Sequence, residues 1–270
     1  MMRLFPKPHL CRPKFARLPK GKLVTVAAGL LSSDGMVLCA DTEEAISEDR
    51  KGTTASKIRT FKSHTLLEDG PKFEWTVGVA GAGHSDWVLK FSQDFDDRML
   101  KKIDRQKTNF TKFGQLLEEY NQGFFERYIK GYAEDPSQRP QAHMLVLVQF
   151  SGNPLLRNIF RINDNLVLSP EVSDCIAVGK GAAVFQSLAD RLLNGSYTMA
   201  QMASIAVYIM DRVKSEVPGV GGNTHIVMIG PDGIDRAIPT RRVKELEFHH
   251  ADVEFRMDSA FAEELIKELP

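Results

Sequence analysis

The chain has 270 residues, of which 43% are hydrophobic and 26% are charged, and its acidic and basic residues balance to a formal net charge of zero. This composition is ordinary for a globular protein, and it gives no reason to expect nucleic acid or a membrane as a partner. No apolar run approaches the roughly 18 residues of a membrane-spanning helix. The three cysteines are sparse and odd in number, which favours a reducing compartment, and we expect a cytoplasmic protein.

The two ends of the chain differ in charge from its middle. Residues 1–24 hold seven Lys or Arg and no acid, and four prolines disfavour an amphipathic targeting helix there. The basic segment also lacks the apolar region of a secretory signal. We therefore predict a leader or propeptide over residues 1–23, one domain over 24–237, and an acidic extension over 238–270, whose last 26 residues hold eight acids.

The first elements predicted after the leader are the two strands of a β-hairpin. Val24–Leu31 and Met36–Ala40 are rich in aliphatic residues, and the turn between them contains Asp34-Gly35, a strong tight-turn signal. Thr25 stands at the start of the first strand and Asp41 at the end of the second. Asp41 follows Thr25 by sixteen residues, and Lys57 follows Asp41 by the same interval.

A hydroxyl, a carboxylate and an ammonium group can together support nucleophilic catalysis. A threonine hydroxyl is a poor nucleophile until a base takes its proton. If Thr25 became the N-terminal residue, its own α-amino group, with an ordinary pKa of about 7.7–8.0, could act as that base. A lysine held cationic by a carboxylate would lower the pKa of that amine. Alternatively, Thr25 is an ordinary strand residue, and Asp41 and Lys57 form a structural ion pair.

The next part of the chain predicts two more strands and then two helices. His84-Ser85-Asp86 offers N-cap residues for the first helix, and Asn109 or Thr111 begins the second. The segments expected before these helices are a strand over Ser56–Phe61, a polar loop over Leu66–Lys72, a strand over Phe73–Gly81, and a break at Gly81-Ala82-Gly83.

The second half of the chain repeats this order of strands and helices. The predicted strands are His143–Phe150, Leu155–Ile162, Asp174–Val178 and His225–Ile229, and the predicted helices are Ala182–Leu193 and Thr198–Ser215. Strands, two helices, strands, two helices and a final strand indicate a layered α+β domain.

With these features in place, the sequence resembles the proteasome β-type N-terminal-nucleophile hydrolases over about residues 24–235. The Thr25, Asp41 and Lys57 spacing matches that family without a gap, and Gly29 and the turn at Asp34-Gly35 also fall where the family has them. The resemblance implies an α+β fold of the four-layer αββα sandwich type, in which two antiparallel sheets lie between two layers of helices.

The resemblance also implies a threonine-type endopeptidase that becomes active when its leader is removed. Thr25 would attack the peptide bond with its free amine as the base, Lys57 would tune that amine, and Asp41 would hold Lys57. The N–H of Gly81 would form the oxyanion hole. The family implies neither a cofactor nor a metal. Its partners would be a peptide or unfolded protein as substrate, the other subunits of a homo- or hetero-oligomeric ring, and an ATPase unfoldase.

The sequence departs from the family at five supporting positions. Lys180 stands where the family has a serine, and Val217 and Val220 stand where it has an aspartate and a serine. Glu43 replaces an arginine. Val24 replaces the glycine before the nucleophile, and its β-branched side chain resists a tight self-cleaving turn. Because the supporting polar groups are missing, we expect slow hydrolysis, and a non-catalytic scaffold subunit that keeps its leader is the alternative function.

Three other motifs have simpler interpretations. Gly179-Lys180-Gly181 is a fragment of a phosphate-binding loop, but it lacks the other glycine and the Ser or Thr after the lysine, which favours a strand-to-helix turn. His84 could act as a base, although its position favours the N-terminus of a helix at the edge of a cleft. His249-His250 has no further ligand at a convincing metal spacing.

Overall fold

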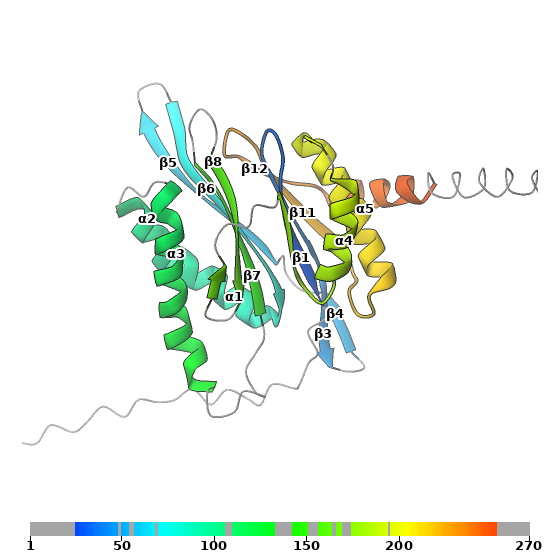
Figure 1. Cartoon of the computed structure of the whole chain (residues 1–270), viewed down its shortest axis with the longest axis horizontal. Helices are drawn as coiled ribbons and strands as arrows, with labels where there is room; N and C mark the ends of the chain where they lie inside the picture. The colour runs from blue at the N-terminus through cyan, green and yellow to red at the C-terminus, as the bar shows by residue number, and fades with distance from the viewer. Residues whose placement is uncertain are drawn as a thin grey trace, which may run out of the picture.

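Two five-stranded antiparallel sheets form the centre of the protein (Figure 1). The computed structural model describes residues 25–252 apart from 48–49, 54–56, 68–69, 106–109, 133–141, 151–155, 164–165, 169–173 and 194. The first sheet consists, in spatial order, of β10 (Cys175–Gly179), β1 (Val26–Leu31), β2 (Met36–Asp41), β11 (Thr224–Ile229) and β12 (Asp235–Ala237). The second consists of β5 (Ile58–Leu67), β6 (Gly70–Gly83), β7 (Ala142–Phe150), β8 (Leu156–Asn163) and β9 (Leu166–Leu168).

Helices cover the outer face of each sheet. The second sheet is covered by α1 (Ser85–Asp94), the π-helical η1 (Phe95–Leu100), α2 (Lys101–Arg105), α3 (Phe110–Phe124), the π-helical η2 (Phe125–Ile129) and the 3₁₀ turn η3 (Lys130–Tyr132). The first sheet is covered by α4 (Ala182–Leu192), α5 (Met199–Glu216) and a helix over 240–252. Figure 1 shows the two helix layers on opposite sides of the strands. The predicted αββα sandwich is therefore confirmed.

The alternation of side chains along β1 explains why this strand lies at the centre of two hydrophobic layers. Val26, Ala28 and Leu30 point outward into the cluster formed with α4 and α5. Ala27 points inward, into the cluster between the two sheets. Because successive strand residues face opposite sides, a strand buried on both faces must be apolar throughout, as this one is.

Two glycines allow the sheets to interlock. A methyl group built on Gly29 of the first sheet would lie 2.6 Å from Leu147 of the second. In the opposite direction, a methyl group on Gly78 of the second sheet would lie 2.6 Å from Leu38 of the first. Each glycine thus leaves space for a leucine of the facing sheet, which is the reciprocal filling that a close-packed core requires.

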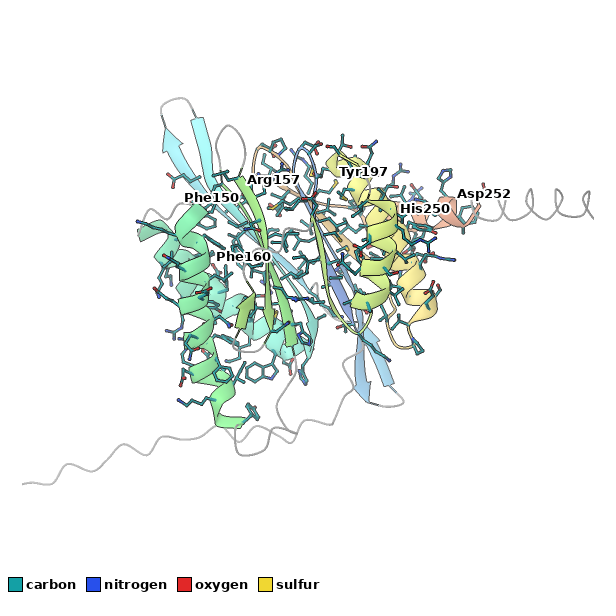
Figure 2. All side chains as sticks on the ribbon, in the orientation of Figure 1. Phe150, Arg157, Phe160, Tyr197, His250 and Asp252 are labelled. Carbon is teal, nitrogen blue, oxygen red and sulfur yellow. The ribbon has the colours of Figure 1, made fainter. Side chains whose placement is uncertain are left out.

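The far end of the first hairpin is anchored by groups from both halves of the molecule. Arg157 on β8 donates to the carbonyl oxygens of Ser32 and Gly35, the latter at 2.9 Å. The N–H of Ser33 donates to the carbonyl oxygen of Tyr197 at 2.8 Å. Figure 2 shows Arg157 and Tyr197 at the same end of the molecule. Because the hairpin is held at its turn, its opposite end, where Thr25 and Asp41 lie, has a fixed position.

Several predicted element boundaries were wrong. The loop expected over Leu66–Lys72 is largely strand, since β5 extends to Leu67 and β6 begins at Gly70. The break expected at Gly81–Gly83 is also strand. The sequence did not predict β9, β12, or a small separate hairpin of β3 (Glu43–Ser47) and β4 (Arg50–Thr53). These strands are short or polar, so they carry little hydrophobic periodicity.

The helix over 240–252 packs on α5, although we predicted an acidic extension over 238–270. Val243 is buried among the residues that α4 and α5 place on the first sheet. The ring of His250 meets that of Tyr208 edge to face, with centroids 5.6 Å apart. His250 Nε2 also lies 3.3 Å from Ser204 Oγ. Figure 2 shows His250 and Asp252 on the outer side of this helix layer.

We predict that Gly78→Ala destabilises the protein by about 1–3 kcal/mol, because the added methyl group would force Leu38 or Ile229 out of position. Gly131→Ala is the matched control, since a methyl group there would have no atom within 4 Å apart from its own neighbouring backbone. Chemical denaturation of both variants measures the free energy of unfolding. Equal stability of the two variants would contradict the interlocking of the sheets.

Candidate active site

Thr25 lies immediately before β1 and is held by backbone groups from both sheets. Its carbonyl oxygen accepts the N–H of Lys180 at 2.9 Å, just after β10 of the first sheet. Its side-chain Oγ1 accepts the N–H of Gly83 at 2.7 Å, at the end of β6 in the second sheet. With only 3% of its surface exposed, Thr25 has a defined position in the structure.

Gly179 makes the first of these contacts possible. Its φ angle is +96°, in the region that residues with a side chain rarely adopt. A methyl group built on Gly179 would also lie 2.3 Å from the carbonyl oxygen of Thr25. The glycine that opens the Gly179-Lys180-Gly181 turn is therefore explained by the close approach of Thr25, with no need for a phosphate.

Asp41 and Lys57 form a buried ion pair beside Thr25. Lys57 Nζ lies 2.9 Å from Asp41 Oδ1, and the two side chains are 2% and 0% exposed, respectively. The same carboxylate oxygen accepts the N–H of Val26, the residue after Thr25, at 3.3 Å. The other oxygen, Oδ2, accepts the N–H of Gly221 at 3.4 Å. The carboxylate is thus shared between the lysine and the backbone on two sides.

The register of the hairpin explains the first interval of sixteen residues. In the antiparallel pairing of β1 with β2, Ala27 stands opposite Ala40. One pair further on, Asp41 reaches the position opposite Val26, beside Thr25. The sequence interval between Thr25 and Asp41 is thus the length of two strands and their turn. Lys57 precedes β5, and the facing of the two sheets brings it to Asp41.

Burial dominates the electrostatics of this pair. It raises the pKa of Asp41 above its ordinary value, while Lys57 and the N–H donors of Val26 and Gly221 act in the opposite direction. His225 on β11 stands opposite Ala40 in the register of β2 and β11. Its pKa is lowered, first by burial and then by the charge of Lys57. His225 is a neighbour of the pair that the sequence analysis missed, since a lone His in a strand carries no signal.

The structure does not bring Gly81, the predicted oxyanion donor, to Thr25. The N–H of Gly81 donates instead to the carbonyl oxygen of Lys57 at 3.3 Å, as part of the pairing around Ile58 and Ala80. The N–H that reaches Thr25 Oγ1 belongs to Gly83, two residues later. Gly83 therefore contacts Thr25, whereas the Gly81 N–H is used in pairing with the Lys57 carbonyl oxygen.

The supporting positions differ from the resembled family in the way the sequence indicated. Val217 and Val220 are buried in the cluster beneath α4 and α5, so they add apolar contacts and no polar group. Lys180 is exposed, and its Nζ donates to the carbonyl oxygen of Pro218 at 2.9 Å. The segment over 217–223 therefore reaches the site through backbone groups, of which the Gly221 N–H is one.

The remaining candidates take no part in this arrangement. His84 is the N-cap residue of α1, with no capping hydrogen bond from its side chain. Among the residues that the structure describes, no three His, Cys, Asp or Glu side chains gather as a metal site would require. No described helix is long and apolar enough to cross a membrane. Cys39 and Cys175 are both free and buried.

Comparison with known proteins identifies solved structures of the same fold. Anbu (ancestral beta-subunit) from Yersinia bercovieri is 16% identical with a TM-score of 0.64, and the match covers 91% of this chain and 98% of that one. Anbu from Hyphomicrobium sp. strain MC1 is 12% identical with a TM-score of 0.63, covering 87% and 97%. The Anbu complex from Pseudomonas aeruginosa, solved as a helical assembly, is 17% identical with a TM-score of 0.61, covering 91% and 97%. No protein-family model and no curated protein matches the sequence.

These comparisons correct the family indicated by the sequence. The Thr25, Asp41 and Lys57 spacing suggested the proteasome β-type subunits, whereas the similar solved structures are Anbu proteins, which are proteasome-like but form a distinct family. The physical reason is that the spacing of Thr25, Asp41 and Lys57 follows from the length of the first hairpin and from the way the two sheets face each other. These are properties of the fold, so they do not distinguish one family with this fold from another. At 12–17% identity the likeness shows that this chain has the fold of the N-terminal-nucleophile hydrolases.

Proposed function

We propose that this protein is a threonine-type peptidase of the N-terminal-nucleophile hydrolase type, which hydrolyses peptide bonds after residues 1–24 are removed. The observation that carries the proposal is the buried ion pair of Lys57 with Asp41, whose atoms Nζ and Oδ1 lie 2.9 Å apart. The same Asp41 oxygen accepts the N–H of Val26, the residue next to Thr25. A buried ion pair costs desolvation energy, and a hydrophobic pair of similar size often serves stability as well. An ion pair at this position is therefore better explained by chemistry than by stability.

The reaction follows from the groups around Thr25. Its hydroxyl oxygen attacks the carbonyl carbon of the substrate, and the hydroxyl proton passes to the free α-amino group of the same residue. The proton is then given to the leaving amine as the peptide bond breaks, which leaves an ester on Thr25. Water hydrolyses this ester and restores the hydroxyl. The Gly83 N–H, which contacts Thr25 Oγ1 at 2.7 Å, is within reach of the oxyanion that forms at the attacked carbonyl.

Asp41 and Lys57 support this reaction through charge. Lys57, kept cationic by the carboxylate, would lower the pKa of the Thr25 amine, so that more of the amine is in its basic form at neutral pH. Asp41 holds the ammonium in place and receives backbone N–H groups on both of its oxygens. The site is built from its own side chains and backbone groups, and the proposed chemistry involves no cofactor.

A non-catalytic structural subunit is the second candidate function. The buried side chains of Val217 and Val220 favour it, because neither can donate a hydrogen bond to the Thr25 amine or hydroxyl. Such a subunit would keep its leader, and the ion pair would have a structural role only. In both cases we propose that the chain works in an oligomer. A ring remains a prediction, as do a peptide or unfolded protein as substrate, an ATPase unfoldase as partner, and a cytoplasmic location.

We expect Thr25→Ala to abolish hydrolysis in protein whose chain begins at residue 25. Such protein can be made by cleaving a fusion directly before that residue, and hydrolysis is measured with a panel of short fluorogenic peptides. Thr60→Ala is the matched control, because the Thr60 hydroxyl donates to Asp235 between the sheet edges and takes no part in the site. If the chain beginning at Thr25 has no activity that Thr25→Ala removes, the peptidase proposal fails.

We expect kcat/KM to fall on the acid side first as the Thr25 amine is protonated, and again at a pH above the ordinary aspartate pKa of about 3.9 as Asp41 is protonated. Burial raises the pKa of Asp41, and protonation of its carboxylate removes the charge that holds Lys57. The measurement is kcat/KM as a function of pH, with circular dichroism at each pH to confirm that the protein stays folded. If this second fall is missing, or lies at a lower pH in protein that is still folded, the Asp41 carboxylate is not required.

Lys57→Met should lower the free energy of unfolding by about 3–5 kcal/mol, because it leaves the Asp41 carboxylate buried without its partner. Lys57→Arg keeps the charge but changes its geometry, so stability should largely hold while activity falls. Adding Asp41→Asn to Lys57→Met should restore part of the lost stability. Losses that simply add in the double variant would show that the two side chains do not form an energetically coupled pair.

A further inference from the structure

The segment over 217–223, between α5 and β11, supports Asp41 with its backbone alone. Its Gly221 N–H donates to Asp41 Oδ2 at 3.4 Å, and its two valines are buried on the side away from solvent. The segment contains three glycines and neither a hydroxyl nor a carboxylate. Glycine-rich backbone has high conformational entropy, so the position of this N–H depends on what restrains the segment.

Two lysines donate to carbonyl oxygens of this segment from opposite sides. Lys180, after β10, donates to Pro218 at 2.9 Å. Lys214, on the last turn of α5, lies 3.5 Å from the carbonyl oxygen of Gly222. The second contact is long, and Lys214 makes it while also paired to a carboxylate, which sets the direction of its side chain.

That carboxylate belongs to Glu247, on the helix over 240–252. Glu247 Oε1 lies 2.7 Å from Lys214 Nζ and accepts the hydroxyl of Thr224 at 3.3 Å. Thr224 is the first residue of β11, and it stands opposite Asp41 in the pairing with β2. One carboxylate oxygen therefore contacts both elements that flank the segment over 217–223: Lys214 on α5 before it and Thr224 on β11 after it.

The Glu247–Lys214 ion pair is more deeply buried than the neighbouring Glu245–Arg241 ion pair of the same helix. Its side chains are 19% and 13% exposed. Two residues earlier, Glu245 pairs with Arg241, and these side chains are 44% and 90% exposed. An exposed pair of that kind contributes little to stability. Of the two pairs, the Glu247–Lys214 pair is the one that contacts the segment beside Asp41.

We propose that Glu247 and Lys214 are positioning residues for the reaction, which hold the segment over 217–223 so that the Gly221 N–H stays on Asp41. This inference rests on the proposed function, because it assigns the pair a role in supporting Asp41 and Lys57. It gives the helix over 240–252 a part in the site, although the helix lies on the outer face of the first sheet. Val217 and Val220 fit this arrangement. Their buried side chains anchor the segment, and they form no hydrogen bond that would compete with the Gly221 N–H for the Asp41 carboxylate.

The test compares Glu247→Gln with Glu245→Gln in chains that begin at Thr25. We expect Glu247→Gln to lower kcat about tenfold with little change in KM, the loss that follows when a catalytic group is displaced while substrate contacts remain. Hydrogen–deuterium exchange should become faster in peptides that cover residues 217–223. Glu245→Gln should match the wild type in both measurements. Lys214→Arg should retain more activity than Lys214→Met, because it keeps the charge that pairs with Glu247.

The two readouts separate this inference from the proposed function. If wild-type protein shows no Thr25-dependent hydrolysis, the proposed function fails, and the catalytic role of the pair fails with it. If hydrolysis is present, but Glu247→Gln leaves exchange over 217–223 and kcat unchanged, the positioning role is overturned and the peptidase stands. An equal loss of kcat in Glu245→Gln would also overturn it, because that variant alters the same helix without touching the segment.

Discussion

The buried ion pair between Asp41 and Lys57 is the interaction around which the site is organised. It joins the first sheet to the residue that enters the second, and it depends on the antiparallel pairing of β1 with β2, which places Asp41 beside Thr25. The Arg157 contacts hold the opposite end of that hairpin. A single register thus fixes the distance between the candidate nucleophile and the carboxylate. Because a shift of one residue would turn every side chain to the other face, the two buried faces of β1 keep this register in place.

Backbone groups provide much of what surrounds the three side chains. The N–H groups of Gly83 and Gly221 reach Thr25 and Asp41, and the unusual backbone of Gly179 lets the Thr25 carbonyl approach. Because backbone N–H groups supply these hydrogen bonds, the site stays polar without serine or aspartate side chains at the supporting positions. The positions of these N–H groups depend on packing and on contacts such as that of Lys180 with the Pro218 carbonyl oxygen. Val217 and Val220 contribute to that packing, so they are compatible with an ordered site.

The sequence predicted the features that depend on local pattern and failed where distant segments meet. Apolar runs predicted β1, β2, β7 and β10 to within one or two residues of their ends, and the layered α+β class followed from their order. The Thr25, Asp41 and Lys57 set was found from spacing, and the structure brings Asp41 to Lys57 and to the residue after Thr25. The sequence named Gly81 as the oxyanion donor, but the Gly81 N–H pairs with the Lys57 carbonyl oxygen beside the start of β5, and the N–H that reaches Thr25 is that of Gly83. The family was wrong for a related reason, since the spacing is a property of the fold.

In the proposed reaction, residues 1–24 must be removed before the Thr25 amine can act as a base. This requirement concerns the mature chain alone and does not depend on any substrate. The measurement that tests it is the N-terminal sequence of the protein purified from its own host. We predict a mature chain that begins at Thr25. A mature chain that still carries the residues before Thr25 would contradict it, because an amide nitrogen at that position cannot accept the proton of the hydroxyl.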